Sequence, residues 1–134
     1  MSGLSIPASA RIDMSYVINK SEEIIFVTYS GAIDLAERKQ AVEEACMLID
    51  SSQPLILIDI RNVAVEMSIN ELQEFAAFLA SRDKLKGAKV AVLRSQDRAH
   101  PNLFLESFAY AEGFTMVPFN DLQKSKNWLL GHIK

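Results

Sequence analysis

Among its 134 residues the chain has only one cysteine, Cys46, which excludes a disulfide framework within the chain. A reducing compartment, the cytoplasm, is therefore the expected setting. The five glycines lie far apart, so neither a Walker loop nor a dinucleotide-binding fingerprint is present. Two distant histidines and one cysteine also lack the spacing of a zinc site. We therefore expect no metal and no other cofactor.

Long apolar runs are absent as well. The longest run, residues 75–80, is far shorter than the roughly 20 residues that a membrane-spanning helix needs, so no transmembrane segment is predicted. The first ten residues do not resemble a secretory signal. Lys and Arg total 14 against 17 Asp and Glu, and this net charge of −3 argues against a nucleic-acid partner, which normally requires a basic excess.

The sequence does contain enough apolar residues, 49%, to build a core without disulfides or metal. Residues 1–14 show no sustained periodicity and are predicted to form a loose arm, followed by one domain at residues 15–134. Two β-rich runs, residues 15–19 and 24–30, are separated by a polar connection of hairpin length. The domain is therefore expected to open with an antiparallel pair of strands.

Two helices are indicated by capping boxes, in which an Asp or Ser precedes a Glu by three residues. The first pair, Asp34 and Glu37, predicts a helix over residues 35–49. The second pair, Ser68 and Glu71, predicts a helix that ends near residue 82. Apolar residues recur at helical spacing through this second segment, which supports the helix: Ile69, Leu72, Phe75, Ala76 and Leu79.

Three further strands are predicted between and after these helices. Residues 55–60 form an apolar run interrupted only by Asp59, which is typical of a central strand buried on both faces. Residues 89–93 form the next strand, and residues 115–119 form an edge strand because Pro118 cannot donate to a ladder. Two more helices are expected, one between Pro101 and Gly113 and one after Asn120.

The predicted order is thus β-β-α-β-α-β-α-β-α, an α/β fold with a mainly parallel five-stranded sheet and an antiparallel first strand. Three segments carry a family resemblance: GAID at residues 31–34, LILIDI at residues 55–60 and NWL at residues 127–129. With this layout, the chain resembles the SpoIIAA-like proteins, relatives of the STAS domains that include the anti-sigma-factor antagonists. The resemblance implies a compact βα superhelix and a non-enzymatic regulatory domain that binds a protein partner.

The resemblance also implies a site. In the antagonists, a serine in the loop after the central strand is phosphorylated to control binding of a partner kinase. Matching Asp59 to the strand aspartate of the family places Ser68 at the acceptor position, although Met67 precedes it where the family has Asp. The loop and helix after the third strand then become the expected partner surface, with these candidates: Arg61, Asn62, Glu66 and Ser68.

Other interpretations remain open from the residues themselves. Ser68 already satisfies the pattern of a helix N-cap, which needs no modification. Arg94 and Arg98 follow a strand at its carboxyl end and could anchor an apolar anion in a small-molecule carrier or sensor domain. No Gly-x-Ser-x-Gly elbow supports a hydrolase, so no catalytic residue is assigned. A homodimer is also open, because two-fold pairing is the commonest self-association of soluble proteins.

Overall fold

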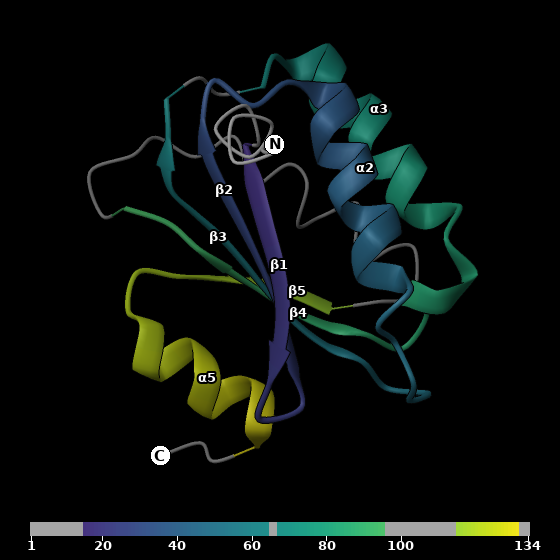
Figure 1. Cartoon of the computed structure of the whole chain (residues 1–134), viewed down its shortest axis with the longest axis vertical. Helices are drawn as coiled ribbons and strands as arrows, with labels where there is room; N and C mark the ends of the chain where they lie inside the picture. Colours follow the sequence, from purple (N-terminus) through teal and green to yellow (C-terminus); the bar gives the residue numbers. More distant parts are fainter. Residues whose placement is uncertain (1–14, 65–66, 96–114, 132–134) are drawn as a thin grey trace, which may run out of the picture.

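The computed structural model describes residues 15–64, 67–95 and 115–131. Its five strands form one sheet in the order β1-β2-β3-β4-β5, with α2 and α3 on one face and α5 on the other (Figure 1). The strands are β1 (Tyr16–Ser21), β2 (Ile24–Gly31), β3 (Leu55–Val63), β4 (Lys89–Leu93) and β5 (Thr115–Phe119). The helices are α2 (Leu35–Cys46), α3 (Ile69–Ala80), a short 3-10 helix (Asp83–Leu85) and α5 (Leu122–Leu130).

The direction of each strand agrees with the predicted topology. β1 is antiparallel to β2, and each later strand is parallel to its neighbour. β3 is the central strand, and β5, which contains Pro118, lies at the edge as predicted. The predicted arm at residues 1–14 and the helix expected over residues 101–113 lie outside the described residues.

The hairpin between β1 and β2 has a tighter turn than predicted. Ser21 pairs with Ile24, so only Glu22 and Glu23 form the connection. Both glutamates have positive φ angles, 56° and 69°. This conformation is that of a type I′ turn, whose twist matches that of the two strands it joins. Lys20 and Ser21 therefore belong to β1 rather than to the loop.

The central strand is longer than predicted, since β3 continues past Ile60 to Val63. A register shift between Thr28 and Ser30 of β2 absorbs one extra residue of β3, as a β-bulge does. Pairing then resumes between Ser30 and Asn62. The prediction that Arg61 and Asn62 lie in a loop after the strand is therefore wrong, because the strand continues through both residues.

Both predicted helices begin at their capping residues but end earlier than predicted. After Cys46, the N–H groups of Leu48 and Ile49 donate to the carbonyls of Ala45 and Cys46, three residues back, at 2.9 and 3.2 Å. Such short-range bonds tighten the last turn of a helix. α2 thus stops at Cys46 rather than at residue 49, and α3 stops at Ala80 rather than at residue 82.

The sheet is covered by apolar side chains on both faces. Ile56 and Ile58 of β3 belong to the larger core cluster, which also contains the buried residues of α2 and α3. Leu57 points the other way, into a smaller cluster with Leu129 of α5. Both faces of β3 are therefore buried, which accounts for its nearly unbroken apolar sequence.

Tyr16 ties the edge strand β1 to α2. Its side chain is buried, and its hydroxyl donates to the Oε2 atom of Glu44 at 2.7 Å. Burial, followed by the hydrogen bond to the Glu44 carboxylate, raises the pKa of Tyr16 from 10.0 to about 12. The folded protein thus holds the Tyr16 proton more tightly than the unfolded chain does.

This difference predicts a loss of stability in alkaline solution. Because the pKa of Tyr16 is raised by folding, its contribution is complete below the unfolded value of 10.0 and is lost as the pH rises towards about 12. Burial raises the pKa of Tyr29 as well, so Tyr16→Phe should reduce the alkaline decline without abolishing it. Urea unfolding followed across this pH range measures the decline. Identical declines in the wild type and Tyr16→Phe would contradict the assignment.

Candidate functional site

Ser68 is the N-cap of α3. Its Oγ atom accepts a hydrogen bond from the N–H of Glu71 at 3.2 Å, and the Glu71 carboxylate accepts one from the N–H of Ser68 at 3.0 Å. Both halves of the predicted capping box are present. The N-cap interpretation of Ser68 is thereby confirmed. Ser68 itself is exposed.

An apolar side chain stands beside this serine. Ile69, in the first turn of α3, is 67% exposed. Ile69 thus lies outside the core, although it belongs to the same helical spacing as the buried Leu72. Met67, the residue before the cap, packs against the core cluster that contains Leu72, which is the arrangement of a hydrophobic staple. Because Met67 supplies the apolar contact at the start of the helix, Ile69 is left at the surface.

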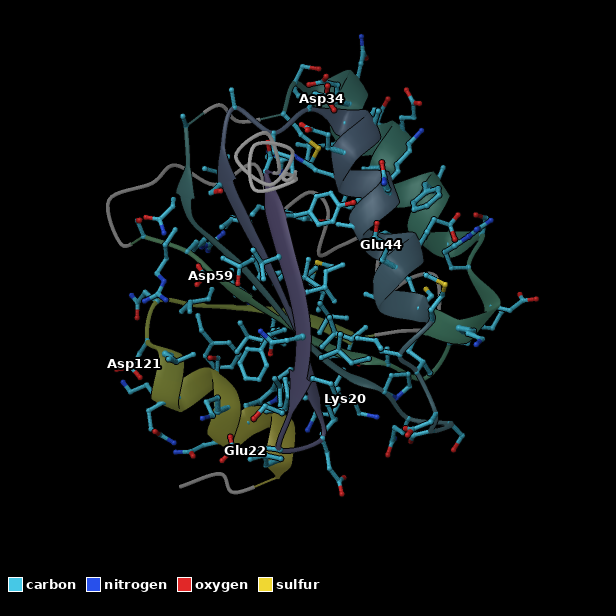
Figure 2. All side chains as sticks on the ribbon, viewed as in Figure 1. Lys20, Glu22, Asp34, Glu44, Asp59 and Asp121 are labelled. Carbon is cyan, nitrogen blue, oxygen red and sulfur yellow. The ribbon has the colours of Figure 1, made fainter. Side chains whose placement is uncertain are left out.

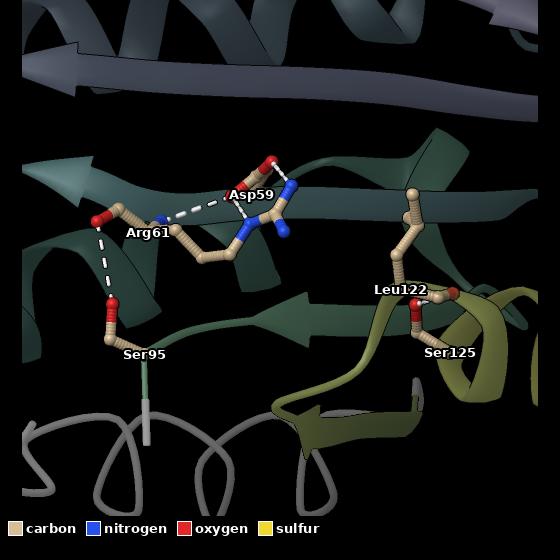
Figure 3. A network of polar contacts seen from close by, with 5 residues as sticks. All are labelled: Asp59, Arg61, Ser95, Leu122 and Ser125. Atoms are coloured by element: carbon tan, nitrogen blue, oxygen red, sulfur yellow. Dashed lines mark hydrogen bonds and ion pairs between the residues drawn. The ribbon is translucent and has the colours of Figure 1, made fainter. Parts of the chain in front are cut away.

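Asp59 and Arg61 form a separate polar cluster (Figure 3). The Nε atom and a terminal nitrogen of Arg61 lie 3.1 and 2.9 Å from the two Asp59 carboxylate oxygens. The N–H of Arg61 also donates to Asp59 at 3.0 Å. The Asp59 carboxylate raises the pKa of Arg61 through its hydrogen bonds. Asp59 is thus a strand residue that is bonded to the backbone N–H and to the side chain of Arg61.

The structure divides the candidate partner residues between two sides of the sheet. Asp59 lies two residues after Leu57, on the side that α5 covers, and Figure 2 shows it across the sheet from α2. The side chain of Arg61 forms an ion pair with Asp59 on this side. Ser68, in contrast, lies at the start of α3, on the opposite side of the sheet. The Asp59–Arg61 pair and the Ser68 cap therefore lie on opposite faces of the sheet.

The other candidates are placed less completely. Glu66 and Arg98 lie outside the described residues. Arg94 directly follows β4 and is half-buried, and its N–H donates to the carbonyl of Phe119 at 2.9 Å. The next residue, Ser95, has its Oγ atom 3.5 Å from the Arg61 carbonyl. The carboxyl ends of β3 and β4 therefore meet, but the two-arginine anion anchor stays a prediction.

A buried arginine in α2 was not among the predicted site residues. Arg38 is only 5% exposed, and its guanidinium lies 5.4 Å from the centre of the Tyr29 ring. Burial lowers the pKa of Arg38, while the charges of Glu71 and Asp34 act in the opposite direction. Glu71 is the capping glutamate of α3. Arg38 thus places a positive charge near the same helix N-terminus that Ser68 caps.

The sequence already contained a signal for this burial. Position 38 is three residues after Leu35 and four before Val42, so helical spacing places Arg38 on the apolar face of α2. Residue type alone suggests the opposite, because arginine is seldom buried unless it is paired. Periodicity was the better guide at this position.

The part of the chain that the structure describes contains neither a metal-binding group nor a membrane-spanning helix. Within residues 15–64, 67–95 and 115–131, His, Cys, Asp and Glu side chains form no group of three or more that could hold a metal ion. Over the same residues, no helix is both long enough and apolar enough to cross a membrane.

Comparison with known proteins supports the fold through structure rather than sequence. No known protein family matches the sequence, and no curated protein matches it. An uncharacterized protein from Shewanella loihica PV-4 with a SpoIIAA-like fold matches 85% of this chain and 91% of its own, with a TM-score of 0.54 and 17% identity. The fold is SpoIIAA-like.

A second solved structure with the same similarity is an anti-sigma factor antagonist from Mycobacterium paratuberculosis. It matches 95% of this chain and 99% of its own, with a TM-score of 0.54 and 20% identity. The match thus extends over nearly the whole of both chains. The SpoIIAA-like architecture expected from the resemblance is confirmed, with its antiparallel first strand and its parallel remainder.

Proposed function

We propose that this SpoIIAA-like domain is a non-enzymatic regulatory domain that binds a protein partner through the N-terminal part of α3. The observation that carries the proposal is the pairing of an exposed capping serine, Ser68, with an exposed apolar neighbour, Ile69. The structural similarity to an anti-sigma factor antagonist supports this class of function. We restrict the partner surface to α3, because Arg61 lies on the other side of the sheet.

The surface at the start of α3 has the composition of a small protein-binding site. Ile69 offers an apolar side chain that is 67% exposed, and Ser68 and Asn70 beside it are also exposed. An apolar anchor with a polar surround is the usual anatomy of a protein interface. The helix itself is firmly held, because Leu72 and Phe75 are buried beneath it. The partner would thus meet a rigid surface.

Phosphorylation of Ser68 would control this surface through charge. A phosphate there would sit at the N-terminus of α3, where free N–H groups and the helix dipole favour negative charge. The nearby Arg38 guanidinium would favour it further. The phosphate would also place nearly two negative charges beside Ile69, where a partner must remove water to bind. Phosphorylation would therefore preserve the helix and weaken the contact.

The proposal is tested by isolating the tagged chain gently from its own host and searching for a stoichiometric protein companion by native mass spectrometry. The affinity of that companion is then measured for Ile69→Ala. Truncating an exposed anchor at an interface is expected to weaken binding about tenfold. Met47→Ala is the matched control. Met47 is also an apolar residue whose side chain is exposed, 73%, and it lies at the C-terminal end of α2, away from the start of α3.

Two results would contradict the proposal. A chain that carries no protein companion at stoichiometric level would remove its basis. Equal affinities for the wild type and Ile69→Ala, or equal losses for Ile69→Ala and Met47→Ala, would place the contact elsewhere on the domain.

A further inference from the structure

β1 is an edge strand of the sheet that the described residues form. Within the described part of the chain, β1 pairs only with β2. The N–H of Ser30 donates to the carbonyl of Ser15 at 2.8 Å, which makes these two residues a hydrogen-bonded pair. In an antiparallel ladder such pairs alternate along the strand. The backbone groups of Tyr16, Ile18 and Lys20 therefore point away from β2.

The hairpin turn independently indicates the same alternation of inward-facing and outward-facing backbone groups along β1. A two-residue turn is closed by a hydrogen-bonded pair, and here that pair is Ser21 with Ile24. Counting back in steps of two from Ser21 gives Asn19 and Val17 as the other residues whose backbone groups face β2. Lys20 and Ile18 between them, and Tyr16 before Val17, therefore again have backbone groups that point away from β2.

The opposite edge of the sheet is less suited to pairing. The N–H of Thr115 in β5 donates to the carbonyl of Ala88. The backbone groups of the alternate residues of β5, Met116 and Pro118, therefore point away from β4. Proline has no N–H to donate, which is a common way of blocking an exposed edge. Among the described strands, β1 is thus the edge with an uninterrupted set of donors and acceptors.

We propose that β1 pairs with β1 of a second copy of this chain, antiparallel and about a two-fold axis at Ile18, to form one continuous sheet. Only this register brings all three outward-facing residues of each copy into hydrogen-bonded pairs. Ile18 then faces Ile18 of the second copy, and Tyr16 faces Lys20. The proposal goes beyond the proposed function, because it concerns assembly and a different surface.

Charge complementarity is the reason for choosing a second copy as the occupant. On the α2 side of β1, Lys20 is held near the hairpin turn by Asp50 at 2.9 Å, and Glu44 is bonded to Tyr16 at the other end of the strand. Figure 2 shows Lys20 and Glu44 well separated along this edge. The two-fold axis reverses the strand, so Lys20 of each copy approaches Tyr16 and Glu44 of the other. Lys20 stays paired with Asp50 of its own chain and gains a second contact of opposite charge with Glu44 of the other copy, while the two Lys20 side chains stay apart.

The geometry also leaves the proposed partner surface open. β1 lies at the edge of the sheet, whereas α3 follows the central strand β3. Pairing through β1 would therefore not cover Ser68 or Ile69. A failure to dimerise and a failure to bind the partner are therefore distinguishable, because dimerisation is tested at β1 and partner binding is tested at α3.

Sedimentation velocity of the full chain over a range of concentrations tests the association, and amide hydrogen exchange tests its location. We expect a concentration-dependent dimer. The amides of Tyr16, Ile18 and Lys20 should become protected only as the dimer forms, while those of Val17 and Asn19 should be protected at all concentrations. A chain that remains monomeric at the highest concentration, or a dimer that leaves the outward amides unprotected, would overturn the proposal.

Charge reversal provides a second, independent test. Lys20→Glu places a carboxylate near Glu44 of the second copy and is expected to raise the dimer dissociation constant about tenfold. The double variant Lys20→Glu/Glu44→Lys restores opposite charges and should recover most of the affinity. Lys126→Glu is the control, because Lys126 forms a similar pair, 2.9 Å from Glu22, on α5. Equal effects of Lys20→Glu and Lys126→Glu, or no rescue by the double variant, would contradict the proposed register.

Discussion

Ser68→Asp is expected to weaken binding of the protein partner about 100-fold, while the free energy of unfolding changes by less than about 0.5 kcal/mol. Aspartate caps a helix as well as serine does, so the hydrogen bond to the N–H of Glu71 is kept. The new carboxylate, however, stands beside the exposed Ile69 and must lose water when a partner covers it. Titration calorimetry with the isolated companion measures the change in affinity.

Ser68→Asn is the control for this variant. Asparagine is also a good N-cap and has nearly the same shape as aspartate, but it adds no charge. It should therefore bind the partner nearly as well as the wild type. Ser68→Ala separates the capping role, because it should lower stability by about 1 kcal/mol with little effect on binding. Equal binding by the Asp and Asn variants would show that charge at Ser68 does not control the contact.

Phe75→Ala is expected to lower the free energy of unfolding by about 3–5 kcal/mol, the largest loss of stability among the variants considered. Phe75 is 2% exposed and belongs to the core cluster beneath α3, and it lies 6.4 Å from the ring of Phe78. Removing its ring leaves a cavity between α3 and the sheet. Equilibrium unfolding in urea measures the loss.

Ile69→Ala, six residues earlier in the same helix, is the contrast. Its side chain is 67% exposed, so the same measurement should show a change within about 0.5 kcal/mol. Large losses in both variants would mean that Ile69 is buried in solution. That result would remove the exposed anchor on which the proposed partner surface depends.

The local parts of the fold could be predicted from the sequence because their causes are local. The Asp34 and Ser68 capping boxes fix where α2 and α3 begin, through bonds that span three residues. Pro118 marks an edge strand because it lacks an N–H. Helix ends were predicted less well, since the short-range bonds that close α2 at Cys46 have no comparable residue signature.

The candidate site could be predicted only in part. Ser68 is at the start of α3 as expected, but the sequence grouped it with Arg61 because the two residues are close in the chain. A β-bulge where the register shifts between Thr28 and Ser30 keeps Arg61 in β3, and Asp59 holds the Arg61 side chain on the other side of the sheet. The position of a bulge depends on pairing with a distant strand, which periodicity within one segment does not contain.

The sequence by itself determined the α/β class, the strand order along the chain and the residues that cap α2 and α3, because alternation and capping act over a few residues. Only the tertiary structure decided which side chains are exposed. It left Ile69 at the surface because Met67 packs on the core instead, and it buried Arg38 against Tyr29. It also placed β1 at an edge of the sheet that the described strands form. Exposure depends on which distant elements cover a residue, and those elements meet only when the chain folds.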